Sequence, residues 1–267
     1  MESIARLFLC FLMYSCLGWV CECIYCWALD RKFTNRGFLS GPLCPVYGFG
    51  ALLVLAALGR LRGHIVLIFL GGFVLTSVLE YLTSLLLEKV FHMAWWDYSD
   101  CKFNLNGRVC LRNSTLFGLL AVAAVELIAP TVTAAASAPS PTAAVWLAFA
   151  AWCVLEADLI LSVHSVLALS GKLQALAQLK QEIRAKSTEA ASLLRTKLSA
   201  QSQKYTDAEL RLRAEIDLLT ARLSAMESSV RFPVRRLMDA FPRLRSLRET
   251  DAIRRIRDAM SARRRVK

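Results

Sequence analysis

The sequence predicts an all-α membrane protein: a polytopic helical bundle of about five spans, then a long coiled-coil-like helix and a basic tail. Fifty-six percent of its residues are hydrophobic, yet its formal net charge is +12, so apolar and charged residues must occupy different parts of the chain. Mostly uncharged apolar segments fill residues 7–169, and charged helix-forming residues follow them. We therefore expect a transmembrane bundle at 1–170, a long amphipathic helix at 171–230 and an Arg-rich cytoplasmic tail at 231–267.

Five apolar segments are the predicted spans. They cover residues 7–29, 43–58, 64–87, 111–129 and 143–169. A helix needs roughly 20 apolar residues to cross the hydrocarbon core, so the second segment is the weakest, and a re-entrant segment is the alternative there. No Ala-x-Ala site follows the first segment and Glu22 interrupts it, so we expect a span and no cleaved signal peptide.

The distribution of basic residues predicts the orientation. The loops after the first and third segments contain Arg31, Lys32, Arg36, Lys89, Lys102, Arg108 and Arg112. Residues 231–267 hold thirteen basic residues against four acidic ones, a net charge of +9. Lys and Arg near spans mark the cytoplasmic side, so both loops and the C-terminus are predicted to be cytoplasmic.

The segment that follows the spans has the features of a coiled coil. Between residues 172 and 230 the sequence has no Gly or Pro, and one helix of that length extends on the order of 90 Å. The seam positions, spaced four and three apart, are Leu212, Ile216, Leu219, Leu223, Met226 and Val230, with Leu198 and Tyr205 upstream and polar Ser202 and Glu209 between them. This seam predicts either a homo-oligomer formed through residues 172–230 or packing against the same chain.

The tail combines apolar and basic residues. Phe232-Pro233 interrupts the helix, and Leu247, Ile253, Ile256 and Met260 lie among arginines. Such a segment can bind anionic lipid, with each basic residue contributing about 1 kcal/mol near the headgroups. A solvated charged tail is the alternative. Nucleic acid is a less favoured partner because no nucleic-acid-binding module accompanies the arginines.

Acidic residues inside the spans point to a polar pathway. Tyr14, Gly18, Glu22 and Tyr25 share one helical face, and Glu80 lies in the third segment. A carboxylate in hydrocarbon costs at least about 3 kcal/mol, and the span cores contain no Lys or Arg to pair with it. We expect Glu22, Glu80, Tyr14 and Tyr25 to line a route for ions or substrate. The remaining acids, Glu126, Glu156 and Asp158, are expected to be solvated near interfaces.

The two predicted cytoplasmic loops supply further site candidates. The first is rich in Gly and Pro and contributes Asn35, Arg36, Cys44 and Tyr47. The candidates in the second are Asp97, Asn104, Asn106 and Arg108. Its Trp95, Trp96 and Tyr98 are expected to be interfacial anchors. We expect the loops to meet and form one pocket with Glu22 and Glu80 beneath it.

No metal site or cofactor is predicted. Cys21 and Cys23 point about 200° apart on a helix, which prevents them from sharing one ligand cage with Cys26. His92, Asp97, Cys101 and Cys110 match no metal-ligand spacing.

Several ordered motifs resemble one family. They are Tyr14-Ser15-x-x-Gly18-Trp19-x-x-Glu22, Asn35-Arg36-Gly37-Phe38-Leu39-x-Gly41-Pro42-x-Cys44-Pro45, Tyr47-Gly48, Glu80-Tyr81, Trp96-Asp97-Tyr98-Ser99 and Asn104-x-Asn106-Gly107-Arg108. Together they resemble the ABC-transporter type IV (CmpB) family over residues 8–130. The resemblance implies a multi-pass protein of the bacterial cytoplasmic (inner) membrane with the role of a permease.

Three functions are consistent with these features. The first is transport. Because the chain contains no G-x-x-x-x-G-K-[ST] phosphate loop, transport driven by ATP requires a separate ATPase subunit. A second hypothesis is a scaffold that recruits partners through its coiled-coil tail. A third is an interfacial membrane enzyme that uses Cys44, His92, Asp97, Asn104, Asn106 and Arg108.

Overall fold

The structure is a computed structural model that describes residues 1–31, 33–200, 203–228, 232–247 and 253–258. The chain forms two compact units. Residues 1–166 and 236–244 make the first, and residues 167–235 and 245–267 make the second. The first unit contains the helical bundle, and residues 236–244 belong to it although the sequence places them in the basic tail.

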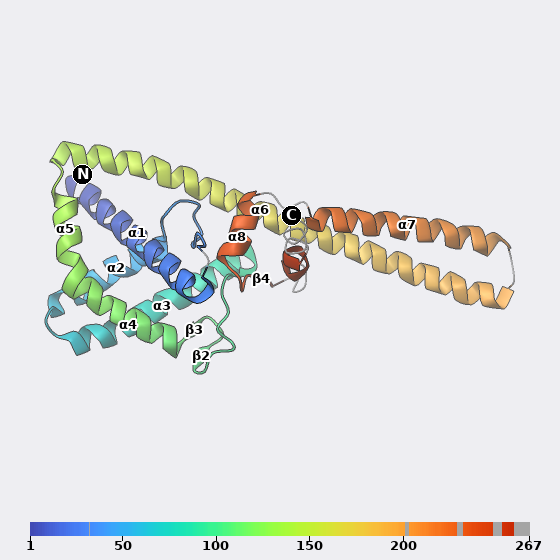
Figure 1. Cartoon of the computed structure of the whole chain (residues 1–267), viewed down its shortest axis with the longest axis horizontal. Helices are drawn as coiled ribbons and strands as arrows, with labels where there is room; N and C mark the ends of the chain where they lie inside the picture. The colour runs from blue at the N-terminus through green and yellow to red at the C-terminus, as the bar shows by residue number, and fades with distance from the viewer. Residues whose placement is uncertain (32, 201–202, 229–231, 248–252, 259–267) are drawn as a thin grey trace. The chain divides into compact units, whose positions relative to one another are not determined.

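The described chain is almost entirely helical, as predicted (Figure 1). The helices of the bundle are α1 (Glu2–Asp30), α2 (Pro45–Leu58), the 3₁₀ turn η1 (Gly59–Leu61), α3 (Ile65–Phe91), α4 (Leu111–Ala123), the π-helical turn η2 (Ala124–Ile128), α5 (Ala129–Ser137) and α6 (Pro141–Ala200). After them come α7 (Gln203–Ser228) and α8 (Phe232–Ala240). The strands are two residues long: β1 (Met93–Ala94), β2 (Asn104–Leu105), β3 (Val109–Cys110) and β4 (Arg245–Ser246), with β2 and β3 forming an antiparallel hairpin.

Four stretches of the described chain are long and apolar enough to cross a membrane. They are Glu2–Ala28, Ile65–Phe91, Leu111–Ser137 and Pro141–Ser192. The second predicted span corresponds to α2, which together with η1 forms a shorter apolar helix, Pro45–Leu61. This is the segment for which the sequence already predicted the shortest crossing.

Contacts at the two ends of the bundle show that α2 passes from one end to the other. We name residues 33–44 the first loop and residues 92–110 the second loop. Phe38 of the first loop packs on Trp95 of the second with ring centroids 5.3 Å apart, so both loops lie at one end. In the chain between the two loops, α3 alone extends ~40 Å at 1.5 Å per residue. The start of α3 therefore lies at the opposite end, and α2 must carry the chain there.

Glycines bring α1 and α2 into close contact. A Cβ atom at Gly18 would overlap the Tyr47 side chain, and one at Gly48 would overlap Ser15 Oγ. Small residues permit such approach in membrane helices, where packing and hydrogen bonds replace the hydrophobic driving force. Gly18 lies on the polar face predicted for the first span, and the Tyr47 side chain fills the space beside it.

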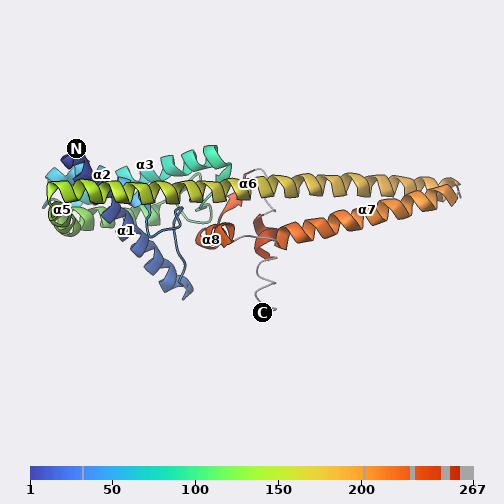
Figure 2. The ribbon, with the colours of Figure 1, turned by 90° about the horizontal axis from the view of Figure 1, so that it is seen from above.

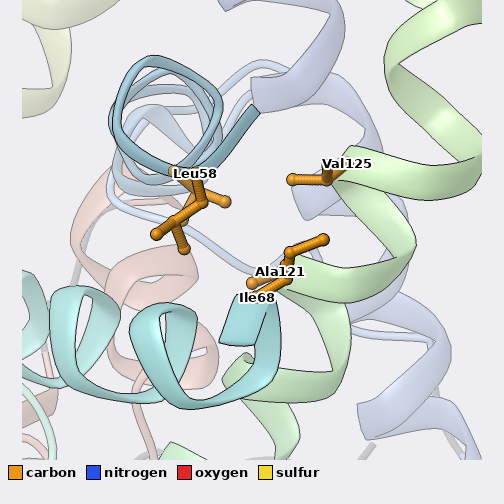
Figure 3. Packing of buried hydrophobic residues seen from close by; sticks show 5 residues of the cluster. Leu58, Ile68, Ala121 and Val125 are labelled. Carbon is orange, nitrogen blue, oxygen red and sulfur yellow. The ribbon is translucent and has the colours of Figure 1, made fainter. Parts of the chain in front are cut away.

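A second set of contacts joins α2, α3 and α4. Val54 and Leu58 of α2 form a buried cluster with Ile68 of α3 and with Ala121 and Val125 of the fourth span (Figure 3). A Cβ atom at Gly72 would overlap Ala121, so α3 and α4 also approach through a small residue. These residues lie toward the end opposite the two loops.

The chain turns sharply between α4 and α5 (Figure 1). The turn occurs at the π-helical segment η2, directly before Pro130, which lacks the N–H needed to continue regular helix bonding. Glu126 in this turn accepts a hydrogen bond from the Gly63 amide at 2.7 Å and lies 3.7 Å from Arg62. These contacts tie the turn to the α2–α3 connection and give Glu126 partners within the protein.

In the second unit, the C-terminal part of α6 and α7 run side by side in opposite directions (Figures 1 and 2). Leu212 and Leu219 of the predicted seam are buried, and Lys186 of α6 forms an ion pair with Glu215 of α7. The expectation of one helix over residues 172–230 is therefore wrong. Because α7 runs back along α6, the seam of α7 packs against its own chain.

Parts of the predicted seam and tail lie outside the described side chains. Those are Leu198, Ser202, Tyr205, Glu209, Val230 and Met260. In the tail, Ile253 and Ile256 are buried in the second unit, and Leu247 is exposed. The apolar residues predicted to face lipid are thus partly used for packing within the protein.

Candidate functional site

The predicted polar face of α1 divides into buried and exposed residues. Tyr14 is only 5% exposed, and its hydroxyl has no hydrogen-bond partner among the described residues. Tyr25 is 43% exposed. The structure therefore places Tyr14 inside the bundle with Gly18 and leaves Tyr25 on its surface.

Glu22 is paired by groups that reach it from outside its own helix. The Tyr47 hydroxyl donates a hydrogen bond to Glu22 Oε1 at 2.6 Å. Arg36 Nε lies 3.9 Å from Glu22 Oε2. The span cores contain no Lys or Arg, so the cation that faces Glu22 is an arginine from a loop.

The first loop is folded against α1 by side chains from that helix. Trp19 Nε1 donates to Asn35 Oδ1 at 2.7 Å, and Asn35 Nδ2 donates to the Ser40 carbonyl at 2.8 Å. The Cys44 amide donates to the Ser15 carbonyl at 3.0 Å. Trp19 and Ser15 belong to the same α1 motif as Gly18 and Glu22, so this motif both builds the α1–α2 contact and holds the loop.

Arg36 extends from this loop toward Glu22. Its Nε donates to Cys26 Sγ at 2.7 Å, and its Nη1 donates to the Ala240 carbonyl. Cys26 is buried, as is Cys23, whose Sγ contacts the Thr34 carbonyl at 3.4 Å. These two cysteines therefore pack against the first loop.

Cys44 is a poor nucleophile in this setting. Burial raises its pKa to about 12, and nearby Glu22 adds to that effect. Because the thiolate is the reactive form of Cys, the raised pKa makes the Cys44 thiol a weaker nucleophile than an ordinary thiol near neutral pH. This argues against the enzyme hypothesis in which Cys44 attacks a substrate.

Glu80 is buried in α3 at 9% exposure. Asn113 Nδ2 lies 3.5 Å from Glu80 Oε1 and donates to the Tyr98 hydroxyl at 2.6 Å. Glu80 Oε2 has no hydrogen-bond partner among the described residues. An unpaired carboxylate oxygen at such a depth is costly, so this side chain favours binding a proton or a cation.

Tyr98 links the two acids. Burial raises the pKa of its hydroxyl, and the charges of Glu80 and Glu22 raise it further. Asn113 Nδ2 joins the Tyr98 hydroxyl to Glu80 Oε1, and the Glu22 charge acts on the same hydroxyl. We name the polar cluster the set Glu22, Arg36, Tyr47, Glu80, Tyr98 and Asn113, contributed by α1, α2, α3, α4 and both loops.

The expectation that Trp95 and Tyr98 are interfacial anchors is wrong, whereas Trp96 is half-exposed. Tyr98 points into the polar cluster, and Trp95 is only 2% exposed. Trp96 Nε1 donates to the Arg108 carbonyl at 2.9 Å. Aromatic residues near a boundary usually serve as anchors, but here they connect the second loop to the bundle.

Asp97 and Asn104 build the second loop. Asp97 Oδ1 accepts hydrogen bonds from the Ser99 amide at 3.0 Å and from the Ser99 hydroxyl at 2.6 Å. Asn104 Oδ1 accepts from the Gly107 amide at 3.0 Å, and its Nδ2 donates to the Cys101 carbonyl at 2.8 Å. Side chains of this kind fix turns by bonding to nearby backbone groups.

Asn106 and Arg108 attach the β2–β3 hairpin to α3. Asn106 Nδ2 donates to the Tyr81 hydroxyl at 3.0 Å, and the Arg108 guanidinium lies over the Tyr81 ring at 5.3 Å. Arg108 Nη2 also bonds to Glu88 Oε2 at 2.5 Å. Four of the predicted loop candidates thus have partners within the loop or on α3.

Asp158 contradicts the expectation that it is simply solvated near an interface. Its two carboxylate oxygens accept hydrogen bonds from the Ser40 amide at 2.9 Å and the Gly41 amide at 2.8 Å. Asn113 was not predicted as a site residue, and Trp19 was noted only within the α1 motif. The signal for Asn113 in the sequence is a polar residue at the start of an otherwise apolar helix. No pattern in the sequence linked Asp158 to the first loop.

The comparisons with known proteins add one match. Residues 9–163, more than half of the chain, match the family described as "Putative ABC-transporter type IV". No curated protein and no solved structure matches the chain. The family region includes every residue of the polar cluster and ends within the first unit.

Proposed function

Because this chain belongs to the ABC-transporter type IV family, which makes it a transport-related membrane protein, we propose that it is a permease or permease-like subunit whose polar cluster lies on the transport route. One observation supports this most directly. Glu22 of α1 and Glu80 of α3 both act on Tyr98, which Asn113 links to Glu80, beneath two loops that meet at Phe38 and Trp95. Intramembrane acids in such positions characterise ion and substrate pathways.

The chemistry of the cluster favours a proton or a cation. Glu22 already faces Arg36, whereas Glu80 retains an oxygen without a partner. A cation or a proton can satisfy that oxygen, and an anion cannot. We propose that Glu80 is the binding carboxyl and that Glu22 with Arg36 forms the gate on the loop side.

The orientation follows from the charges of the loops. Both loops and residues 236–244 lie at one end of the first unit, and Lys and Arg are concentrated there. We propose that this end is cytoplasmic in the inner membrane of a bacterium. Any ATP hydrolysis is proposed to come from a separate ATPase subunit, since the chain has no phosphate-binding loop.

A flux measurement tests the role of the cluster. The purified full-length protein is placed in liposomes that contain a pH-sensitive dye, and proton flux is measured under an imposed K⁺ diffusion potential, with Na⁺ and K⁺ fluxes measured in parallel. Glu80→Gln keeps the size of the side chain and removes its charge, so flux should fall to the level of protein-free liposomes. Glu126→Gln is the control, because Glu126 is bonded to Gly63 outside the cluster.

Equal fluxes in the wild type and in Glu80→Gln argue against a route through this carboxyl. Chemical crosslinking in native membranes, followed by mass spectrometry, tests the proposed ATPase partner separately. A stoichiometric ATPase supports that part of the proposal. A homo-oligomer that purifies without one opposes it and favours association through residues 172–230.

A further inference from the structure

Residues 236–244 fit closely onto the two loops although the sequence places them in a basic tail. We name this segment the latch. It is contained in the first unit, and its Leu237 and Ala240 are fully buried. A charged tail without a binding surface would leave such residues in water, so the latch occupies a defined surface on the bundle.

Arg236 holds the backbone of the first loop. Its guanidinium donates to the carbonyls of Gly37 at 3.3 Å, Phe38 at 2.9 Å and Leu39 at 2.8 Å. Burial lowers the pKa of Arg236, whereas nearby Asp158 raises it. A cation is buried only where polar partners replace its water, and three convergent carbonyls do so for Nη1 and Nη2, while Nε has no hydrogen-bond partner among the described residues.

Asp158 holds the next part of the same loop with the opposite charge. It accepts from the amides of Ser40 and Gly41, which directly follow the three carbonyls bound by Arg236. The carbonyl-presenting half of the loop is thus bound by a cation and the amide-presenting half by an anion. This arrangement holds residues 37–41 in one conformation as long as the latch is in place.

The latch also holds the gate arginine. Arg36 Nη1 donates to the Ala240 carbonyl, while its Nε faces Cys26 Sγ and Glu22. The Ala240 carbonyl lies at the C-terminus of α8, where helix carbonyls lack intrahelical partners and favour a cation. Arg36 therefore remains over Glu22 with one of its donors satisfied by the latch.

Further contacts connect the latch to the second loop. Phe241 packs edge-on against Trp95 with ring centroids 4.9 Å apart, and Trp95 in turn packs on Phe38. Arg243 donates to the Asp97 carbonyl. One nine-residue segment thus contacts both loops at the point where they meet.

We propose that the latch is an internal lock that keeps Arg36 over Glu22 and holds the two loops closed above the polar cluster. Its position in the chain suggests how it is released. Residues 167–235 and 245–267, which flank the latch on both sides, belong to the second unit. A partner or a lipid surface that binds the second unit can therefore pull on the latch through the backbone at both of its ends.

Thiol accessibility tests the lock without any knowledge of the substrate. The full-length protein in nanodiscs is treated with N-ethylmaleimide, and the alkylation rate of each cysteine is measured by peptide mass spectrometry. The variant is Arg236→Gln, which removes the cation. Arg235→Gln is the matched control, because Arg235 is an exposed neighbour in the same helix.

Release of the latch should expose the cysteines that the first loop covers. Arg236→Gln should raise the alkylation rates of Cys26 and Cys44 by about tenfold or more, which corresponds to ~1.4 kcal/mol of local opening. The rate at Cys110, buried in β3, should not change. Arg235→Gln should behave as the wild type.

Two results overturn the proposal. One is an unchanged rate at Cys26 and Cys44 in Arg236→Gln. The other is an equal rise at Cys110, because that pattern reports general loosening of the bundle. Phe241→Ala provides a second variant that leaves Arg236 intact, and it should produce the same pattern to a smaller extent. Since the measurement requires no transport, the lock can fail while the proposed transport route stands, and the reverse also holds.

Discussion

The two loops that cover the polar cluster are held in different ways. The second loop is largely self-supporting, because Asp97 and Asn104 bond to backbone groups a few residues away. The first loop is held by residues distant in sequence, namely Trp19, Asp158 and Arg236. A loop with its own turns stays folded whatever surrounds it, whereas a loop held by remote partners opens when one of them leaves. The first loop is therefore the movable cover of the cluster.

The largest expected effect comes from detaching the second loop from α3. Arg108→Ala breaks the ion pair with Glu88 and leaves the Glu88 carboxylate unpaired. The side chains of both residues are largely buried. Removing one partner of such a pair costs about 3 kcal/mol. Denaturation in detergent should show this loss of stability. Arg112→Ala, which removes the exposed arginine at the second residue of α4, should cost almost nothing.

A smaller loss is expected from Gly107→Ala, which strains a turn of the second loop. Gly107 has φ +68°, and a Cβ atom there would lie 2.6 Å from Ser99 Oγ and 2.7 Å from Asp97 Oδ1. The left-handed conformation and the overlap together should cost about 2 kcal/mol. Thermal unfolding provides the measurement. Gly59→Ala, where a Cβ meets no atom within 4 Å, serves as the control, and equal losses in the two variants would show that the turn geometry is unimportant.

Asp158→Asn should affect the first loop alone. The carboxylate accepts two backbone amides, and the neutral amide side chain can accept them only weakly and through one oxygen. Hydrogen exchange at Ser40 and Gly41 should accelerate by about tenfold, or ~1.4 kcal/mol of local stability, with no change in residues 97–108. Faster exchange in both loops would show that the first and second loops are not held independently. Glu156→Gln is the control on the same helix.

The smallest expected effect concerns reactivity and leaves stability unchanged. Because burial raises the pKa of Cys44 to about 12, its alkylation rate should rise about tenfold per pH unit from pH 7 to pH 10 without reaching a plateau. An ordinary thiol reaches its plateau above about pH 9. A plateau for Cys44 below pH 10 would mean that the first loop does not cover this thiol.

The helices of the bundle could be predicted from the sequence because hydrocarbon imposes a length and a composition on each crossing. Residues 7–29 lie inside α1, the predicted segment 64–87 begins one residue before α3, and the weak second segment appears as the short helix α2. The hairpin of α6 and α7 could not be predicted in this way. A heptad seam indicates that a partner helix exists, but the same seam suits a second chain or a segment of its own chain.

The candidate site was predicted in part. Acidic residues are unusual in apolar helices, so the sequence alone identified Glu22 and Glu80. It also predicted that the loops above them meet. The pairing of Glu22 with Arg36 depends on a loop that folds back, and no sequence spacing encodes that reversal. Tyr98 was misassigned because an aromatic residue near a boundary has the same sequence signature in an anchor and in a buried cluster.

The close contacts at Gly18 and Gly48 have a mechanical consequence. They leave α1 and α2 no room to slide, so Glu22 and Tyr47 move together as one rigid pair. Glu80 and Asn113 belong to α3 and α4, which are joined in the same manner at Gly72. The buried cluster around Leu58 and Ile68 connects the two pairs at the end away from the loops. The two pairs are therefore joined at the apolar end, and parting them near the loops requires Tyr47 to separate from Phe117 of α4, whose ring centroid lies 5.8 Å away.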